Sequence, residues 1–316
     1  MKLNDFEDRG SAVQSVIRSF REGTFPHALL ICGEEGIGKR SLARLFVQGL
    51  LCVSDSERPC GTCKGCKRVT ENRHPNLLLP EKTEKTKGYT VDSLRKILDS
   101  LSRFAFEDRN RVVFLEEAHR MNIQAQNCIL KSIEECDGHT YFILVSNKEA
   151  AILPTIRSRC RILHMGTLEE KKIESIIASQ CDDPDERRRI ALDARGSIGR
   201  AKQMLDDSEY ERIGALCEKT FLSVSRLSQV ASMSKQLKDE KDNAGIILDL
   251  LDVRWQQMIS GNGADYGSKW SGADRNSLNR LRQELIDCQM KLASNVGWPA
   301  VAENLMLKII KEIQTW

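Results

Sequence analysis

The residues best suited to chemistry are four closely spaced cysteines. They have the spacing C-x7-C-x2-C-x2-C and are Cys52, Cys60, Cys63 and Cys66. Four thiolates suit tetrahedral Zn²⁺, and a complete shell of cysteines leaves no position for water, so the metal would be structural. Gly61 and Gly65 allow the tight turns that bring the sulfurs together. The alternatives are redox-active or unpaired thiols. His74 is either a substitute ligand or part of the turn before the next strand.

A glycine-rich segment at residues 33–40 has the sequence and setting of a phosphate-binding loop. It reads GEEGIGKR, follows an apolar run and opens a helix, as a Walker A loop does. Lys39 would reach the terminal phosphates. Arg40 occupies the position of the usual Ser or Thr, whose hydroxyl binds Mg²⁺, and a guanidinium has no acceptor for a metal. The backbone N–H groups that would face a phosphate depend on the turns at Gly33, Gly36 and Gly38.

A second magnesium position is altered after the apolar segment 112–115. Glu116 stands where a metal-holding Asp is usual, and its side chain is one methylene longer. Glu117 takes the place of the carboxylate that activates water. Because both changes concern one ion, we expect inefficient hydrolysis. Two interpretations stay open: the loop binds phosphate or nucleotide without turnover, or it is retained for packing alone.

Short apolar runs alternate with helical patterns through the first half of the chain. The runs at 28–32, 76–79, 112–115, 141–145 and 161–164 predict parallel strands covered by helices on both faces. We therefore predict an α/β P-loop domain over residues 1–166, with the cysteine module at about 52–66. Helical patterns then predict a three-helix lid over 167–208 and a helical domain over 209–316. Pro299 fits the first turn of the last helix, and a glycine-rich stretch contains Gly261, Gly263, Gly267 and Gly272.

Composition limits the classes of function. The 48 basic and 45 acidic residues give a formal net charge of +3, which argues against a dominant phosphate-binding surface. No apolar run approaches the ~18 residues of a membrane span. The first residues are polar and lack an apolar signal core. We therefore expect a cytoplasmic protein, in which clustered cysteines more often bind metal than form disulfides.

The segment at 152–160 makes a resemblance to a known family specific. It ends in Ser158-Arg159-Cys160, and residues 127–135 read NCILKSIEE. Together with the altered loop, the four cysteines and the Glu-Glu pair, this order of motifs is similar to bacterial DNA polymerase III clamp-loader subunits of the AAA+ superfamily. The resemblance covers nearly the whole chain. It implies an AAA+ type parallel-sheet P-loop domain with a zinc insert, followed by a small helical lid and an all-α collar domain for oligomerisation.

The resemblance also implies roles for single residues. In this family the arginine of the Ser-Arg-Cys motif reaches a neighbour's ATP in trans, so Arg159 would be an arginine finger. The alternatives are an ordinary surface salt bridge, or Arg157 as the finger if the loop register is misread. Asn147 and Arg200 resemble the first and second sensors of the nucleotide. Because the nucleotide site is altered, a vestigial role for either sensor stays open.

An altered nucleotide site combined with an intact Ser-Arg-Cys motif resembles the delta-prime type of subunit. This implies a stator with little or no ATP hydrolysis of its own, as a component of the DNA polymerase III holoenzyme. The implied partners are the motor (gamma/tau) and delta subunits, the sliding clamp and primer-template DNA, with ATP and Mg²⁺ at neighbouring subunits. The alternatives are an ATP-hydrolysing gamma/tau-type motor subunit and a zinc-containing nucleic-acid-binding module.

Overall fold

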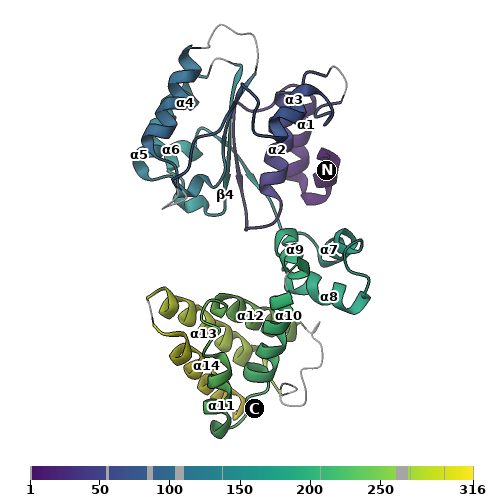
Figure 1. Cartoon of the computed structure of the whole chain (residues 1–316), viewed down its shortest axis with the longest axis vertical. Helices are drawn as coiled ribbons and strands as arrows, with labels where there is room; N and C mark the ends of the chain where they lie inside the picture. Colours follow the sequence, from purple (N-terminus) through teal and green to yellow (C-terminus); the bar gives the residue numbers. More distant parts are fainter. Residues whose placement is uncertain are drawn as a thin grey trace. The chain divides into compact units, whose positions relative to one another are not determined.

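The chain forms two compact units in a computed structural model, which describes residues 2–54, 57–83, 88–103, 110–136, 138–206, 208–260, 270, 272–294 and 296–315 (Figure 1). One unit comprises Met1–Ile173 with Gly196–Arg200, and the other comprises Glu174–Arg195 with Ala201–Trp316. These two units do not coincide with the three domains expected from the sequence, with boundaries at residues 166 and 208. The three-domain division stays a prediction. Three of the four glycines of the predicted glycine-rich stretch, Gly261, Gly263 and Gly267, lie outside the described residues.

A five-stranded parallel sheet lies at the centre of the first unit. Its strand order is β2-β3-β4-β1-β5, and every pairing is parallel. The strands are β1 (Ala28–Cys32), β2 (Leu77–Leu78), β3 (Arg111–Leu115), β4 (Thr140–Ser146) and β5 (Arg161–His164). Residues of β1 and β3 are buried throughout, as expected for strands covered on both faces. The predicted α/β class and all five predicted strands are confirmed.

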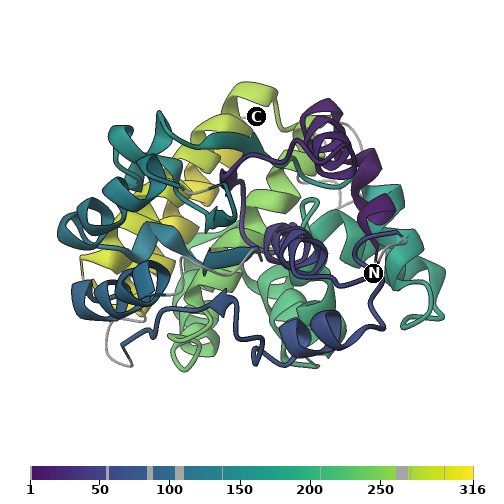
Figure 2. The same ribbon diagram turned by 90° about the horizontal axis from the view of Figure 1, so that it is seen from above.

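Helices cover both faces of this sheet. Figures 1 and 2 place α1 and α2 on one side and α4 and α5 on the other. On the first side, Leu29 and Ile31 of β1 pack in one cluster with residues of α1 and α2. On the second side, Leu30 packs with Ile129 and Ile133 of α5. This alternation follows from the two-residue period of a strand. The helices are α1 (Ser11–Arg21), α2 (Lys39–Leu50), α3 (Lys64–Thr70), α4 (Val91–Arg103), α5 (Ile123–Glu134) and α6 (Pro154–Arg157), with short 3-10 turns η1 (Leu3–Arg9), η2 (Ala118–Arg120) and η3 (Glu149–Ala151).

The rest of the described chain is helical. Trp255 of α12 and Trp298 of α14 are fully buried in the core of the second unit. Pro299 lies in the first turn of α14, as predicted. No helix in the described residues is long and apolar enough to cross a membrane. The helices are α7 (Glu170–Ile177), α8 (Pro184–Asp193), α9 (Ile198–Asp206), α10 (Ser208–Cys217), a π turn η4 (Glu218–Leu222), α11 (Leu227–Leu237), α12 (Ala244–Ser260), α13 (Arg275–Ala293) and α14 (Trp298–Ile313).

A buried ion pair joins two helices of the second unit. Arg254 of α12 binds both carboxylate oxygens of Asp193, the last residue of α8. Their side chains are 7% and 1% exposed. Tyr210 donates a further hydrogen bond of 3.4 Å to the same carboxylate. Arg254 Nη2 also lies 3.8 Å from the exposed Glu218 carboxylate. The buried Asp193 charge therefore depends on Arg254, because an unpaired charge at this depth is costly.

Candidate functional site

The glycine-rich loop connects β1 to α2 at the carboxyl edge of the sheet. Gly33, Gly36 and Gly38 have φ values of 151°, 76° and 97°, a region that favours glycine. The Lys39 side chain is buried and its amine donates a hydrogen bond to the Glu34 carbonyl oxygen. Burial lowers the pKa of Lys39 below its usual range. The loop thus has the turns that its sequence predicts, and its lysine is held by the loop's own backbone.

Residues 196–200 contact this loop through hydrogen bonds to its backbone carbonyl groups. The Ser197 hydroxyl donates to the Glu35 carbonyl oxygen at 3.1 Å, and the Gly199 N–H donates to the Gly36 carbonyl oxygen at 2.8 Å. A Cβ at Gly199 would lie 2.9 Å from the Gly36 Cα, closer than side chains tolerate. The segment that carries Arg200, the expected second sensor, is therefore brought to the loop. The Arg200 backbone N–H donates a hydrogen bond of 3.2 Å to the Ser197 hydroxyl, which itself contacts the loop.

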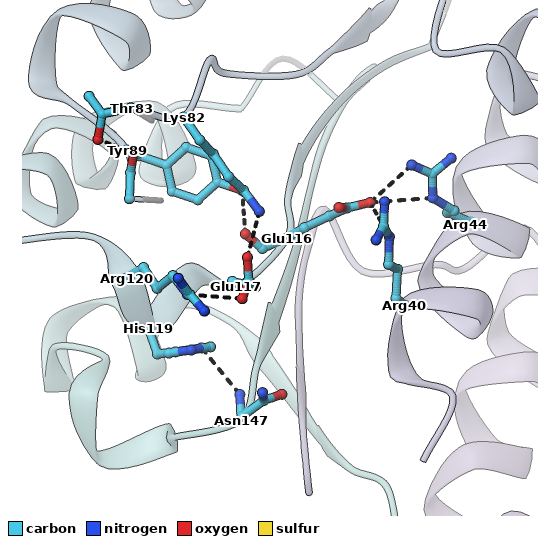
Figure 3. Close-up of polar contacts among 11 residues, drawn as sticks. Arg40, Arg44, Lys82, Thr83, Tyr89, Glu116, Glu117, His119, Arg120 and Asn147 are labelled. Atoms are coloured by element: carbon cyan, nitrogen blue, oxygen red, sulfur yellow. Dashed lines mark hydrogen bonds and ion pairs between the residues drawn. The ribbon is translucent and has the colours of Figure 1, made fainter. Parts of the chain in front are cut away.

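The carboxylate of Glu116 is engaged by two arginines of α2. Arg40 Nε lies 2.8 Å from Glu116 Oε1, and Arg44 Nη2 lies 3.0 Å from the same oxygen. Figure 3 shows both guanidinium groups meeting Glu116 from the side of α2. The residues at both altered magnesium positions thus bind each other. A carboxylate that already accepts charged hydrogen bonds from two cations is a poor ligand for a third.

Glu117 points to a different set of cations (Figure 3). Its backbone is left-handed, with φ of 57°, so consecutive carboxylates diverge. Lys82 Nζ lies 2.7 Å and Arg120 Nε 2.9 Å from its oxygens. Partial burial alone would raise the pKa of Glu117, but the hydrogen bond from Lys82 and the nearby cations outweigh it and hold this pKa below its usual range. A carboxylate with a lowered pKa and two cationic partners is a weak base toward water.

Asn147 follows β4, at the same edge of the sheet. Its backbone N–H donates to His119 Nδ1 over 3.3 Å. Burial lowers the pKa of His119, and only the neutral ring has the lone pair that accepts this hydrogen bond. The structure thus places the expected first sensor position beside the loop that carries Glu117 (Figure 3).

The Ser-Arg-Cys motif lies at the end of α6, and Ser158 and Arg159 are exposed. Arg159 forms an ion pair with Glu134 of α5 and donates to the Thr155 carbonyl oxygen at 2.9 Å. Arg157 instead binds Glu149, at 3.3 Å. The Arg159 side chain is therefore at the surface, where its ion pair partner is itself solvent-accessible.

The four predicted cysteines converge in space. Their sulfurs all lie within 4.8 Å of one another. The closest pairs are Cys52–Cys60 at 3.6 Å, Cys52–Cys63 at 3.8 Å and Cys60–Cys66 at 4.0 Å. A Zn–S bond of about 2.3 Å in a tetrahedron places neighbouring sulfurs about 3.8 Å apart. These donors therefore fit a tetrahedral metal ion such as zinc.

The backbone around the cluster is built for this convergence. Gly61 has φ of 72°, and a Cβ at Gly65 would lie 2.4 Å from the Leu51 carbonyl oxygen. Backbone N–H hydrogen bonds, first from Cys63, lower the pKa of Cys60 to about 6, which favours the thiolate that a metal requires. His74 Nδ1 accepts a hydrogen bond from the Asn76 N–H. It thus belongs to the turn before β2.

Comparison with known proteins identifies the family. The family model described as DNA polymerase III, delta subunit matches residues 9–169, which is about half of the chain. The chain belongs to the delta-prime family of DNA polymerase III subunits. The predicted family is therefore confirmed. The structure also bears out the predicted architecture of a parallel-sheet α/β domain with a four-cysteine insert and helical parts after it.

Individual relatives carry the same name. The delta-prime subunit of Haemophilus influenzae is 33% identical over 49% of this chain and 47% of its own length. That of Pseudomonas aeruginosa is 40% identical over 42% and 41%. The chain thus spans less than half of these two relatives. The delta-prime subunit of Bacillus subtilis is 23% identical over 98% of this chain and 97% of its own.

Several site residues of this delta-prime family member were not found by sequence reasoning. Arg44, Lys82 and Arg120 bind the two glutamates, and the Tyr89 hydroxyl donates to the Glu116 carbonyl oxygen. Burial raises the pKa of that hydroxyl. Arg44 had a usable signal, because it lies four residues after Arg40 and therefore on the same face of the helix. Lys82 and Tyr89 had none, since they come from the segment between β2 and α4.

Proposed function

We propose that this chain acts as the delta-prime (stator) subunit of the DNA polymerase III clamp loader. In this role it helps to load the sliding clamp on primer-template DNA, together with motor (gamma/tau) and delta subunits. It hydrolyses little or no ATP itself and supplies Arg159 to the ATP of a neighbouring subunit. The helical residues after about 208 assemble with the other subunits as a collar, and residues 167–208 form the lid.

The observation that carries the stator role is the pairing of Arg40 and Arg44 with Glu116. In an active P-loop enzyme, a hydroxyl and a carboxylate at these positions hold Mg²⁺ against the nucleotide phosphates. Here the positive charge comes from the protein, and Glu117 is bound by Lys82 and Arg120. These contacts support a site that lacks both a metal ligand and a free base for water.

The exposure of Arg159 supports its role in trans. Arginine is always charged and presents a planar fork to phosphate oxygens. Its pairing with Glu134 is a surface contact, with side chains 39% and 44% exposed, and surface ion pairs contribute about 1 kcal/mol or less. A triphosphate on an adjoining subunit therefore competes effectively for this guanidinium. Arginine fingers accelerate phosphoryl transfer by on the order of 10³–10⁵.

We further propose that the four-cysteine cluster holds a structural zinc ion. Cys52, Cys60, Cys63 and Cys66 would fill all four positions of the metal, so none is left for water or substrate. The metal would fix the cysteine loop against the end of α2. Cys66 Sγ already lies 3.9 Å from the carbonyl oxygen of Gln48, in the last turn of that helix.

The decisive experiment is reconstitution of the complete clamp loader with Arg159→Ala. We expect normal assembly but a strong loss of clamp- and DNA-stimulated ATPase activity. Arg73→Ala is a matched control, because Arg73 is also exposed and its one ion pair with a described residue is a 3.9 Å contact with Glu71. Unchanged ATPase activity with Arg159→Ala would refute the finger. Failure of the wild-type chain to enter the complex would refute the stator role itself.

A motor role is the second candidate. The chain is also 29% identical to the tau/gamma subunit of Haemophilus influenzae, over 62% of this chain and 29% of that subunit. The isolated chain distinguishes the two. Robust Mg²⁺-dependent ATP hydrolysis by this chain alone would favour the motor, and its absence favours the stator.

A further inference from the structure

A large pocket lies in the first unit at the amino ends of the strands, away from the nucleotide loop. Its volume is about 890 Å³, within the range of ligand-binding pockets. One wall is the end of α1 with the turn after it, including Phe20 and Phe25. A second wall is the cysteine loop, including Arg58 and Cys60. Tyr141, at the start of β4, also lines it.

Aromatic rings form the apolar part of this pocket. The rings of Phe20 and Phe25 meet edge to face at 5.6 Å, and those of Phe25 and Tyr141 lie 6.1 Å apart. Phe20 fits here because α2 has Gly49 at the contact, where a Cβ would lie 2.3 Å from the ring. Among the described residues, the Tyr141 hydroxyl has no hydrogen-bond partner. The pocket thus offers an apolar wall with one free phenolic donor.

The charged residues that line the pocket are mainly basic. Among the residues that the structure describes, they are Lys2, Arg21 and Arg58, against one acid, Glu57. Arg21 is already paired with Glu7 at 2.8 Å. Arg58 uses its Nε to bind the Ser54 carbonyl oxygen at 2.8 Å. Its two terminal nitrogens have no hydrogen-bond partner within the described part of the chain and so could bind a ligand. A guanidinium fork of this kind matches a carboxylate.

We propose that this pocket, beside the cysteine cluster, binds an acidic peptide segment of a partner protein through one aromatic or large aliphatic anchor residue. The anchor would enter between the aromatic wall and the cysteine loop, and flanking carboxylates would meet Arg58 and Lys2. Aromatic anchors in pockets with a polar rim are typical of peptide recognition. Single-stranded nucleic acid fits less well, because base stacking needs open ring faces, and these rings pack against one another.

The cysteine cluster links peptide binding in this pocket to metal binding. Cys60 is both a member of the cluster and part of the pocket wall, and Thr62 follows it in the same wall. If the cluster holds zinc, the metal keeps this wall in place. Loss of the metal would then abolish peptide binding without any change in the residues that contact the peptide.

The test is selection of a random peptide library on the metal-loaded full chain, followed by binding measurements with the enriched peptides. We expect acidic peptides with an aromatic or large aliphatic residue, about tenfold weaker binding with Arg58→Glu, and loss of binding after chelation. Arg73→Glu is the matched control and should leave binding unchanged. Absence of enrichment, enrichment of basic peptides, or equal binding by Arg58→Glu would overturn the proposal. Tight, Arg58-dependent binding of single-stranded oligo(dT) without peptide enrichment would replace it with a nucleic-acid site.

Discussion

Replacing Arg40 by threonine should convert the altered loop into one that accepts a magnesium–nucleotide complex. The substitution supplies the hydroxyl that an active loop uses and removes the guanidinium 2.8 Å from Glu116. Arg44 still holds Glu116 at 3.0 Å, so the carboxylate stays in place. We expect the variant to bind ATP more tightly with Mg²⁺ than without it, and the wild-type chain to show no such gain.

The size of the effect follows from electrostatics. The Arg40 side chain is 64% exposed. Using the dielectric constant of water therefore gives a lower bound for the repulsion between Arg40 and a bound Mg²⁺. A unit charge about 4 Å from a divalent cation then opposes it by about 2 kcal/mol, which corresponds to about 30-fold in affinity. The cost to folding should be about 1 kcal/mol or less, because the lost pair is exposed.

The assay is equilibrium titration of a fluorescent ATP analogue, with Mg²⁺ or with excess EDTA. Arg40→Lys is the matched control, because it keeps the charge and offers no hydroxyl. The reasoning is refuted if a folded Arg40→Thr variant responds to Mg²⁺ no more than Arg40→Lys does. It is also refuted if the wild-type chain already binds ATP far more tightly with Mg²⁺.

Three further predictions concern stability. Chelation of the metal, or Cys66→Ser, should remove one zinc ion per chain and lower the thermal midpoint of unfolding, and metal analysis with calorimetry checks this; an unchanged midpoint would contradict a structural metal. Gly65→Ala should be destabilising because its Cβ would lie 2.4 Å from a backbone oxygen. Gly214→Ala, in open space within a helix, should instead stabilise the fold by about 1 kcal/mol. Thermal unfolding should separate the two variants, and equal shifts of the midpoint would contradict the packing argument. Asp193→Ala leaves Arg254 buried and should cost about 3–5 kcal/mol in urea unfolding; a loss below about 1 kcal/mol would show that the pair is not buried.

The sequence predicted the sheet well because its strands are short apolar runs that are buried on both faces. Strands β1 and β5 have the expected bounds. Strands β3 and β4 begin one residue earlier, and β4 also ends one residue later. Only β2 is shorter than expected. It is an edge strand that pairs with β3 alone, and Pro80, shortly after it, has no N–H to donate. Local pattern therefore located the strands, and tertiary pairing determined their ends.

The candidate site was predicted less completely. Glycine positions, the lysine and the two glutamates could be found because their spacing in the chain is the signal. The cations that bind the glutamates could not, because Lys82 lies 35 residues from Glu117 and Arg44 72 residues from Glu116 along the chain. Such contacts depend on how α2 and the segment after β2 pack beside the end of β3, which no local pattern encodes.

Helix α2 is fastened at both of its ends. It begins at Lys39 directly after the glycine-rich loop, and the turn after its last residue carries Cys52 of the cysteine cluster. At the near end it carries the two arginines that face Glu116. A metal ion in the cysteine cluster would therefore fix the C-terminal end of α2, while the arginines near its N-terminal end set the charge of the nucleotide site. Release of the ion would allow these arginines to move, although neither of them contacts the metal.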